Sequence, residues 1–272
     1  DESLETTKIH SVAGQLGDHQ ALMATRPFRA PHHTISSAAL IGGGSIPRPG
    51  EVSLAHNGVL FLDEFAELPR ATLEALRQPL EDGIVTISRS AMTLTFPARF
   101  LMCAAMNPCP CGFHLDTERQ CVCSHAQILK YRSRLSGPMM DRIDLHVEVP
   151  PVKFEALRGH GADEEPSKSI RQRTQAARER QSRRFKEDST GRFCNAHMGK
   201  RHLKEFCSLD TRSEDILESS MRRLGLSARA YDRILKVSRT IADLDNSDRI
   251  EPQHLKEAIQ YRDLDRDKDK QR

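Results

Sequence analysis

The chain has 272 residues, of which 29% are charged, and it combines a net charge of +3 with a mean hydropathy of −0.56. No apolar run approaches the roughly 20 residues of a membrane span. Seven cysteines, an odd number, favour a reducing compartment, so we expect a soluble, cytoplasmic protein without a membrane partner. Aromatic residues are 5% and tryptophan is absent, which argues against a stacking platform for nucleic acid.

Residues 1–25 predict a helix followed by a loop, and they contain neither an initiator Met nor a helix cap. We therefore expect the chain to belong to a larger protein. Residues 26–33 hold two prolines and four basic or imidazole side chains, which predict a rigid, extended segment. This segment is either a surface loop or a contact with a phosphate or a partner. The glycines of residues 42–44 then allow a close approach of the backbone.

Residues 58–64 read Gly-Val-Leu-Phe-Leu-Asp-Glu, an apolar run that ends in two adjacent carboxylates. Such a run predicts a strand buried on both faces of a parallel sheet, and its end lies at the carboxyl edge, where open α/β folds bind ligands. Asp63 is suited there to hold the Mg²⁺ of a nucleotide, and Glu64 to polarise the attacking water. The alternative is a strand end with two solvated acids.

Residues 69–80 have leucines at helical spacing, and Gly83 predicts a left-handed helix end. Residues 84–87 and 92–96 flank a short basic segment and predict a β-hairpin, with Arg89 at its tip.

Residues 100–105 form another apolar run, which predicts a second buried strand ahead of Asn107. The amide of Asn107 can hold a water or a terminal phosphate. The alternative is an ordinary asparagine before the turn-forming Pro108.

Two Cys-x-Cys pairs follow, Cys109 with Cys111 and Cys121 with Cys123, separated by nine residues. Four converging thiolates suit a tetrahedral Zn²⁺ ion. Such an ion would staple the loop and do no chemistry, because no coordination position stays open. The spacing within each pair is tighter than the usual Cys-x-x-Cys, and the alternative is four reduced surface thiols.

Gly137 and Pro138 predict a short helix, and residues 144–149 alternate as a strand. Arg142 lies between them, next to two aspartates, which predicts an exposed guanidinium that can reach the γ-phosphate bound by a neighbouring subunit. The alternative is a local ion pair with one of these aspartates, which is worth little on a surface.

Two prolines at positions 150 and 151 and the polar residues 159–167 predict a domain boundary. We expect an α/β core over residues 1–152, a helical domain over residues 153–262 and a charged tail over residues 263–272.

The helical part begins with strong basic charge. Residues 168–204 carry 12 Lys or Arg against 3 Asp or Glu, about +9, which leaves about −6 for the remainder. Residues 170–186 predict an Arg-rich helix, which is either a DNA contact or a solvated face. Arg229 falls in the first turn of a later amphipathic helix, where a helix N-terminus and an arginine together suit a phosphate. Its alternative is a solvated surface arginine.

Several stretches carry a resemblance that extends from about residue 9 to residue 262. They are residues 26–33, 42–44, 48–58, 60–64, 107–112 and 132–150. Over them the chain resembles the magnesium-chelatase-like AAA+ ATPases, in the branch of bacterial competence proteins and not that of the pigment-making chelatase subunits.

This resemblance implies a P-loop-type parallel-sheet core with a β-hairpin insertion and a C-terminal helical lid. It also implies a ring, a hexamer in this family, that binds ATP and Mg²⁺ between subunits. Asp63 and Glu64 resemble the Walker B pair, and Asn107 resembles sensor 1. Arg142 resembles the arginine finger, and Arg229 resembles sensor 2.

The activity that the resemblance implies is ATP-driven translocation on single-stranded or branched DNA, with branch migration during natural transformation. The hairpin of residues 84–96 resembles the insertion that lines the pore, so Arg89 is our candidate for gripping the DNA backbone.

One departure from the family is plain. Its members carry a Walker A loop, after a strand, ahead of the region that this chain matches, and the pattern G-x-x-x-x-G-K-[ST] is absent from the 272 residues. We expect the sheet to lack a member and this chain alone to bind nucleotide poorly. Two other readings stay open: a non-catalytic DNA-binding or assembly piece, and a chelatase-type subunit that drives metal insertion.

Overall fold

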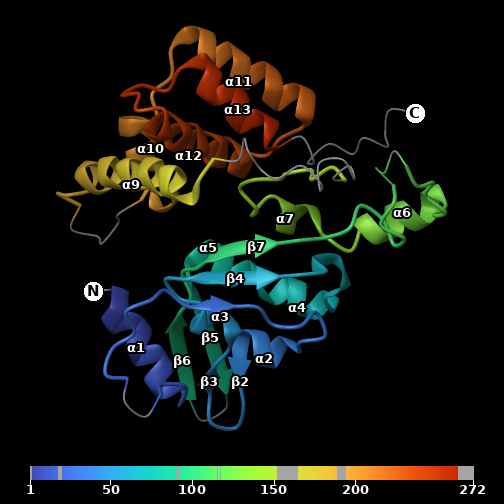
Figure 1. Ribbon diagram of the computed structural model, residues 1–272, viewed down its shortest axis with the longest axis vertical. Helices are drawn as coiled ribbons and strands as arrows, with labels where there is room; N and C mark the ends of the chain where they lie inside the picture. The colour runs from blue at the N-terminus through green and yellow to red at the C-terminus, as the bar shows by residue number, and fades with distance from the viewer. Residues whose placement is uncertain are drawn as a thin grey trace. The chain divides into compact units, whose positions relative to one another are not determined.

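A computed structural model describes most of the chain, over residues 2–17, 20–89, 92–114, 116, 118–151, 165–188 and 194–262. The chain divides into two compact units, Asp1–Arg142 and Ile143–Arg272 (Figure 1). The boundary predicted between residues 152 and 153 and the predicted tail of residues 263–272 fall at or within segments outside the described ranges, so both stay predictions.

The first unit is built on a parallel sheet of three strands in the order β1-β4-β7. These strands are Phe28–Arg29, Val59–Leu62 and Leu101–Ala104. Their register aligns Val59 of β4 with Phe28 on one side and Leu101 on the other. The three strands therefore point the same way, and their carboxyl ends meet at one edge of the sheet (Figure 1). This arrangement confirms the predicted α/β fold class.

Burial of β4 differs between its two faces. Leu60 and Leu62 are 0% and 1% exposed, whereas Val59 and Phe61 on the other face are only half-buried. The prediction of a strand buried on both faces is therefore correct for one face and wrong for the other. Within the described residues β7 pairs only with β4, and its Leu101 is 66% exposed.

Short helices and a small ribbon surround this sheet. The helical elements of the first unit are α1 (Glu2–Val12), α2 (Ser37–Ile41), α3 (Glu51–Leu54), η1 (Phe65–Glu67), α4 (Arg70–Ala75), α5 (Arg77–Asp82), α6 (His125–Arg132) and α7 (Gly137–Met140), and the ribbon is β2 (Gly42–Gly43) with β3 (Arg48–Pro49). The single helix predicted over residues 69–80 is split into α4 and α5 at Leu76. Gly83 ends α5 with a φ of +67°, as predicted.

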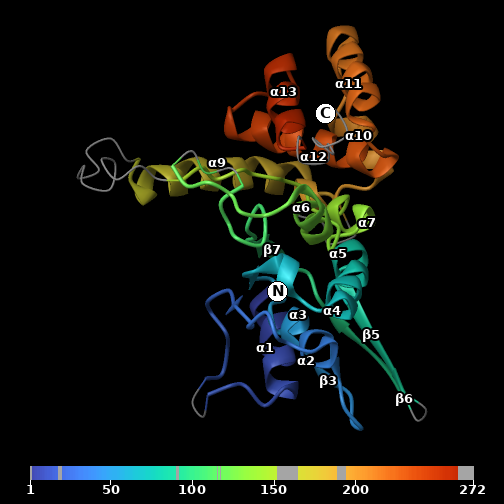
Figure 2. The same cartoon turned by 90° about the vertical axis from the view of Figure 1, so that its right-hand side faces the viewer.

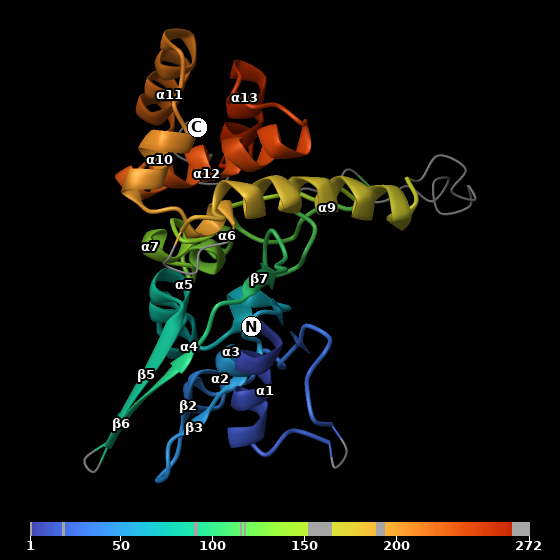
Figure 3. The same cartoon turned by 90° about the vertical axis from the view of Figure 1, so that its left-hand side faces the viewer.

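The predicted hairpin is present. β5 (Ile84–Arg89) pairs antiparallel with β6 (Met92–Pro97), and Figures 2 and 3 show the pair as a narrow arm that extends away from the sheet. Val85 and Ile87 are buried on one face near the base of the arm. The side chain of Arg89, our candidate DNA contact, lies outside the described part of the chain.

The second unit is helical. Its elements are α9 (Ser167–Arg184), η2 (Asn195–His197), α10 (Lys200–Phe206), α11 (Thr211–Leu224), α12 (Ala228–Leu244) and α13 (Pro252–Gln260). α12 contacts α9, α10 and α13, so it lies at the centre of the unit. Its Ile234 and Leu235 pack in one core with Leu255 of α13, which explains the apolar periodicity read from the sequence.

Residues 144–149 form no strand, contrary to the prediction. The backbone N–H of His146 donates to the C=O of Tyr261 over 2.8 Å, and the guanidinium of Arg262 donates to the C=O of Ile143. Alternating side chains therefore occur here in an extended segment without a ladder of strand hydrogen bonds. None of the described helices is long and apolar enough to cross a membrane.

Gly58 provides a direct test of the sheet. A Cβ added to Gly58 would lie 2.0 Å from the C=O of Pro27, which accepts the N–H of Val59. Because that oxygen belongs to the β1–β4 pairing, we expect Gly58→Ala to lower the free energy of unfolding by about 1–3 kcal/mol, measured by urea titration of the purified chain. Gly17→Ala is the matched control, since nothing lies within 4 Å of its added Cβ. Equal stability of the two variants would contradict this account.

Candidate functional site

Two carboxylates and an asparagine lie at the carboxyl edge of the parallel sheet. Pairing continues past the two strands, because the N–H of Ala105 donates to the C=O of Leu62 and the N–H of Phe65 donates to the C=O of Ala105, both over 2.9 Å. Asp63 and Glu64 lie between Leu62 and Phe65, and Asn107 follows Ala105 by two residues. All three side chains are exposed. The sequence-predicted residues are therefore on neighbouring strand ends, and we call this set the carboxyl edge.

Glu64 has an unusual backbone. Its φ of 48° and ψ of 43° lie in the left-handed region, which costs a non-glycine residue about 1 kcal/mol or more. The turn leads into η1, and the N–H of Glu64 donates to Oδ1 of Asp63 over 2.8 Å. Such strain at a polar strand end is typical of a functional position.

His33 completes this edge, and sequence reasoning did not assign it there. Nδ1 of His33 lies 2.6 Å from Oε2 of Glu64, and the ring of His32 lies beside that of His33, tilted by 34°, with 4.1 Å between the ring centroids. Since both histidines follow β1, all three strands contribute polar groups to one edge. The available signal was the histidine pair that ends the predicted extended segment of residues 26–33, interpreted from the sequence as a surface loop or as a phosphate or partner contact.

Arg142 is buried, and the prediction of an exposed guanidinium is wrong. Its side chain is 6% exposed, forms an ion pair with Glu81 of α5, and donates from Nη1 to the C=O of Pro138 over 2.6 Å. The local alternative, a pair with a neighbouring aspartate, also missed this partner. Glu81 lies 61 residues away in sequence, so the residues next to Arg142 along the chain do not indicate it.

This ion pair predicts a stability effect. Arg142→Ala removes the ion pair with Glu81 and opens space beside α7, so we expect a loss of about 1–2 kcal/mol in the free energy of unfolding, moderated because Glu81 is 43% exposed. Thermal and urea unfolding measure it. Arg222→Ala is the control, because Arg222 is 80% exposed in a surface pair with Glu218 and should cost under about 0.5 kcal/mol. An equally small loss for Arg142→Ala would exclude a stabilising pair.

Arg229 lies in the second unit. It occupies the first turn of α12, where the hydroxyl of Ser227 caps the helix by accepting the N–H of Ala230 over 3.3 Å. Its side chain is exposed, in keeping with either reading of the sequence.

Some of the basic side chains of α9 form ion pairs within the second unit. Arg184 donates two hydrogen bonds, of 2.5 and 2.7 Å, to the fully buried carboxylate of Asp243. Arg180 pairs with Asp248 over 2.7 Å. These two arginines stabilise the helical unit, so the charge of this segment overstates what is available to a partner.

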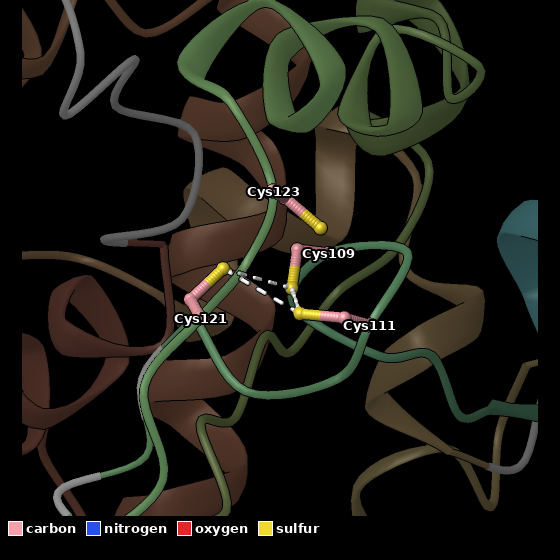
Figure 4. Close-up of side chains that lie close together, drawn as sticks. All are labelled: Cys109, Cys111, Cys121 and Cys123. Atoms are coloured by element: carbon pink, nitrogen blue, oxygen red, sulfur yellow. Dashed lines mark hydrogen bonds between the residues drawn. The ribbon is translucent and has the colours of Figure 1, made fainter.

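The predicted sulfur cluster is present. Sγ of Cys109 lies 3.4 Å from that of Cys111 and 3.7 Å from that of Cys121, and Cys111 and Cys121 are 3.5 Å apart. With Cys123, the four sulfurs lie within 4.8 Å of one another, and Figure 4 shows them converging from two chain segments. We call this set the cysteine cluster.

The electrostatics of the cysteine cluster favour at least one thiolate. The backbone N–H of Phe113, with a further contribution from Val122, lowers the pKa of the Cys111 thiol to about 6. Burial raises the pKa of the Cys123 thiol to about 12. A sulfur that is already ionised at neutral pH, among three close neighbours, is a suitable first ligand for a soft or borderline cation.

The fold and the carboxyl edge define an AAA+-type α/β module followed by a helical domain. A family model described as "Magnesium chelatase, subunit ChlI" matches residues 1–157, and one described as "Magnesium chelatase, subunit ChlI C-terminal" matches residues 164–262. The chain therefore belongs to the magnesium chelatase family, as the resemblance in the sequence predicts.

Two bacterial proteins are similar to the chain over nearly its whole length. The chain is 46% identical over 266 residues to the uncharacterized protein YifB of Escherichia coli, and 47% identical over 262 residues to the competence protein ComM of Haemophilus influenzae. These matches cover 98% and 96% of this chain but 51% and 50% of the relatives, so the chain spans about half the length of the curated relatives it matches. A weaker match, 25% over 223 residues, joins 77% of the chain to 25% of the zygotic DNA replication licensing factor mcm6 of Xenopus tropicalis.

Proposed function

We propose that this chain is part of an ATP-hydrolysing AAA+ ring motor that acts on DNA, of the kind that drives branch migration during natural transformation. The observation that carries the proposal is the joint position of Asp63, Glu64 and Asn107 on two neighbouring parallel strand ends. The similarity to a competence protein and to a DNA replication licensing factor supports DNA as the substrate. Membership of the magnesium chelatase family supports a ring, which we propose to be a hexamer.

The carboxyl edge fits a nucleotide-bound Mg²⁺ ion. Magnesium keeps several waters and takes one or two carboxylates together with phosphate oxygens, and Asp63 is an exposed carboxylate at such a position. The ion supplies charge neutralisation to the transferring phosphoryl group. Asp63 holds the ion or its water, Glu64 accepts the proton of the attacking water, and Asn107 orients that water or the terminal phosphate. His33 holds the carboxylate of Glu64 until a nucleotide arrives.

Phosphate binding needs more than this chain supplies. The 272 residues contain no G-x-x-x-x-G-K-[ST] loop, which in P-loop proteins cradles the phosphates with backbone amides and a lysine. We therefore propose that the chain alone binds nucleotide poorly. The outer edge of β7, where Leu101 is 66% exposed, offers backbone groups to which a further parallel strand can pair.

The remaining predicted residues take their roles in the assembled ring. Arg142 acts as the arginine finger toward a neighbour's nucleotide, which requires its guanidinium to leave Glu81. Arg229, at the N-terminus of α12, contacts the nucleotide as sensor 2. The β5–β6 arm lines the pore, and Arg89 binds the DNA backbone.

Substituting the proposed base tests the function. In the full-length protein, Glu64→Gln should retain ATP binding and lose turnover by about 10²–10⁴-fold, because the amide cannot take a proton from water. Nucleotide binding and phosphate release in the presence of DNA measure the two effects. Glu218→Gln, at a side chain 63% exposed on α11, is the control and should behave as wild type. Turnover that survives in Glu64→Gln would refute the assignment of Glu64.

A non-catalytic role in binding DNA or in assembly is the second candidate. The basic α9 and the cysteine cluster favour it, since neither requires ATP. Neither candidate predicts ATP hydrolysis by this chain alone. The two differ once a Walker A loop is supplied, because only the motor then predicts activity.

We also infer that the cysteine cluster holds one structural Zn²⁺ ion. Four sulfurs within 4.8 Å of one another match the ligand set of a closed tetrahedral site, which leaves no position for substrate.

Elemental analysis tests the zinc directly. Protein purified under reducing conditions and washed with a weak chelator should contain about one zinc ion per chain. Cys121→Ser, which removes a ligand, should lower the zinc content by at least about tenfold at the same chelator concentration. Cys194→Ser, in the second unit, should keep it. Wild-type protein without zinc, or equal zinc in both variants, would rule out this site.

A further inference from the structure

The segment that carries Asn107 runs directly into the cysteine cluster. β7 ends at Ala104, Asn107 follows at the carboxyl edge, and Cys109 lies two residues later. Cys109 is 0% exposed, whereas the side chain of Asn107 is exposed. One short stretch therefore holds both an amide of the proposed catalytic site and a buried sulfur of the cluster.

A tight turn over residues 109–112 brings the start of the cluster close to Asn107. The N–H of Gly112 donates to the C=O of Cys109 over 3.0 Å, which closes a turn around Cys111. Gly112 has a φ of +84°, and a Cβ built on it would lie 3.9 Å from Oδ1 of Asn107. The turn that contains two of the four sulfurs therefore lies close to the amide of Asn107.

The second cysteine pair is tied to the same point through α6. Ser124 directly follows Cys123 and caps the N-terminus of α6. At the other end of this helix, Nε of Arg132 donates to the C=O of Pro108 over 3.3 Å. Pro108 is the residue after Asn107. The chain therefore leads from Cys123 through a rigid helix back to the peptide unit next to Asn107.

The two chain segments that lead from Asn107 and from α6 meet in the cysteine cluster. Its two halves meet through thiol contacts of 3.4–3.7 Å, which are weak as hydrogen bonds. A metal ion bonded to four thiolates replaces them with strong, directional bonds. With the metal bound, a continuous series of bonded groups runs from Asn107 through the first cysteine pair, the metal, the second cysteine pair and α6 back to Pro108.

We propose that Zn²⁺ in the cysteine cluster positions Asn107, so that the metal controls turnover at the carboxyl edge without touching the nucleotide. The cysteines are positioning residues in this account, and Asn107 is the group that they position. The inference rests on the proposed function, because the position of Asn107 affects turnover only where the carboxyl edge hydrolyses ATP.

The first arm of the experiment measures Asn107 without any activity. The side-chain amide signal of Asn107 in ¹⁵N-labelled, reduced 272-residue protein is assigned from its loss in Asn107→Ala. We expect one sharp signal with bound zinc, its shift or broadening after chelation, and its return when ZnSO₄ is added. The signal should not respond in Cys123→Ser, and it should respond fully in the matched control Cys194→Ser. A signal in the wild type that ignores zinc removal overturns the inference.

The second arm measures turnover in the full-length protein. Cys123→Ser should lower kcat for ATP hydrolysis by about tenfold with little change in KM, because a misplaced catalytic group affects the chemical step. Combined with Asn107→Ala, it should cause no loss beyond that of Asn107→Ala alone, since both act through one side chain. Losses that multiply would show that the cluster acts only on stability, and would overturn the inference.

The two arms separate this inference from the proposed function. If wild-type full-length protein hydrolyses no ATP, the proposed function fails, and the Asn107 signal still decides whether zinc positions this amide. If the wild type hydrolyses ATP and Cys123→Ser matches Cys194→Ser in kcat, the proposed function stands and the inference falls. Because zinc is removed from the wild type and added back, the effect of zinc on Asn107 is measured even where a variant fails to fold.

Discussion

Parallel pairing between β4 and β7 is the interaction on which the candidate site depends. Leu62 pairs with Ala104, so the chain leaves both strands at the same height; Asp63 follows directly on one side, and Asn107 follows three residues later on the other. A slip of one residue would turn every side chain to the opposite face. On the other side of β4, close packing of Gly58 against the C=O of Pro27 constrains the register of the β1–β4 pairing and leaves no room for any larger residue.

Strain and exposure at the carboxyl edge are compensated by the elements behind it. Glu64 adopts a left-handed backbone, while the next residue, Phe65, is 1% exposed and donates its N–H to Ala105. Burial of a phenylalanine contributes roughly 1.5–3 kcal/mol, enough to hold such a turn in place. The edge therefore combines a rigid, apolar interior with acids that face solvent and are open to a ligand.

The ion-pair partners of the buried arginines in this chain are not their neighbours in the sequence. Arg142 has aspartates on both sides but pairs with Glu81, and Arg184 of the basic segment pairs with Asp243, 59 residues away. Both arginines are largely buried, where an unpaired charge would be costly, so each needs a carboxylate that the fold brings to it. Counting neighbours along the chain could not identify these partners.

Features with a strong local signal were determined by the sequence alone. The apolar period of α12, the left-handed Gly83, the hairpin and the convergence of four cysteines all follow from short-range spacing, and the structure has each of them. Only the tertiary structure decided what meets across long separations, His33 against Glu64 and Glu81 against Arg142, and that one face of β4 is only half-buried. The physical reason is that local spacing fixes backbone conformation, whereas the partner of a charged or polar side chain depends on how distant elements pack.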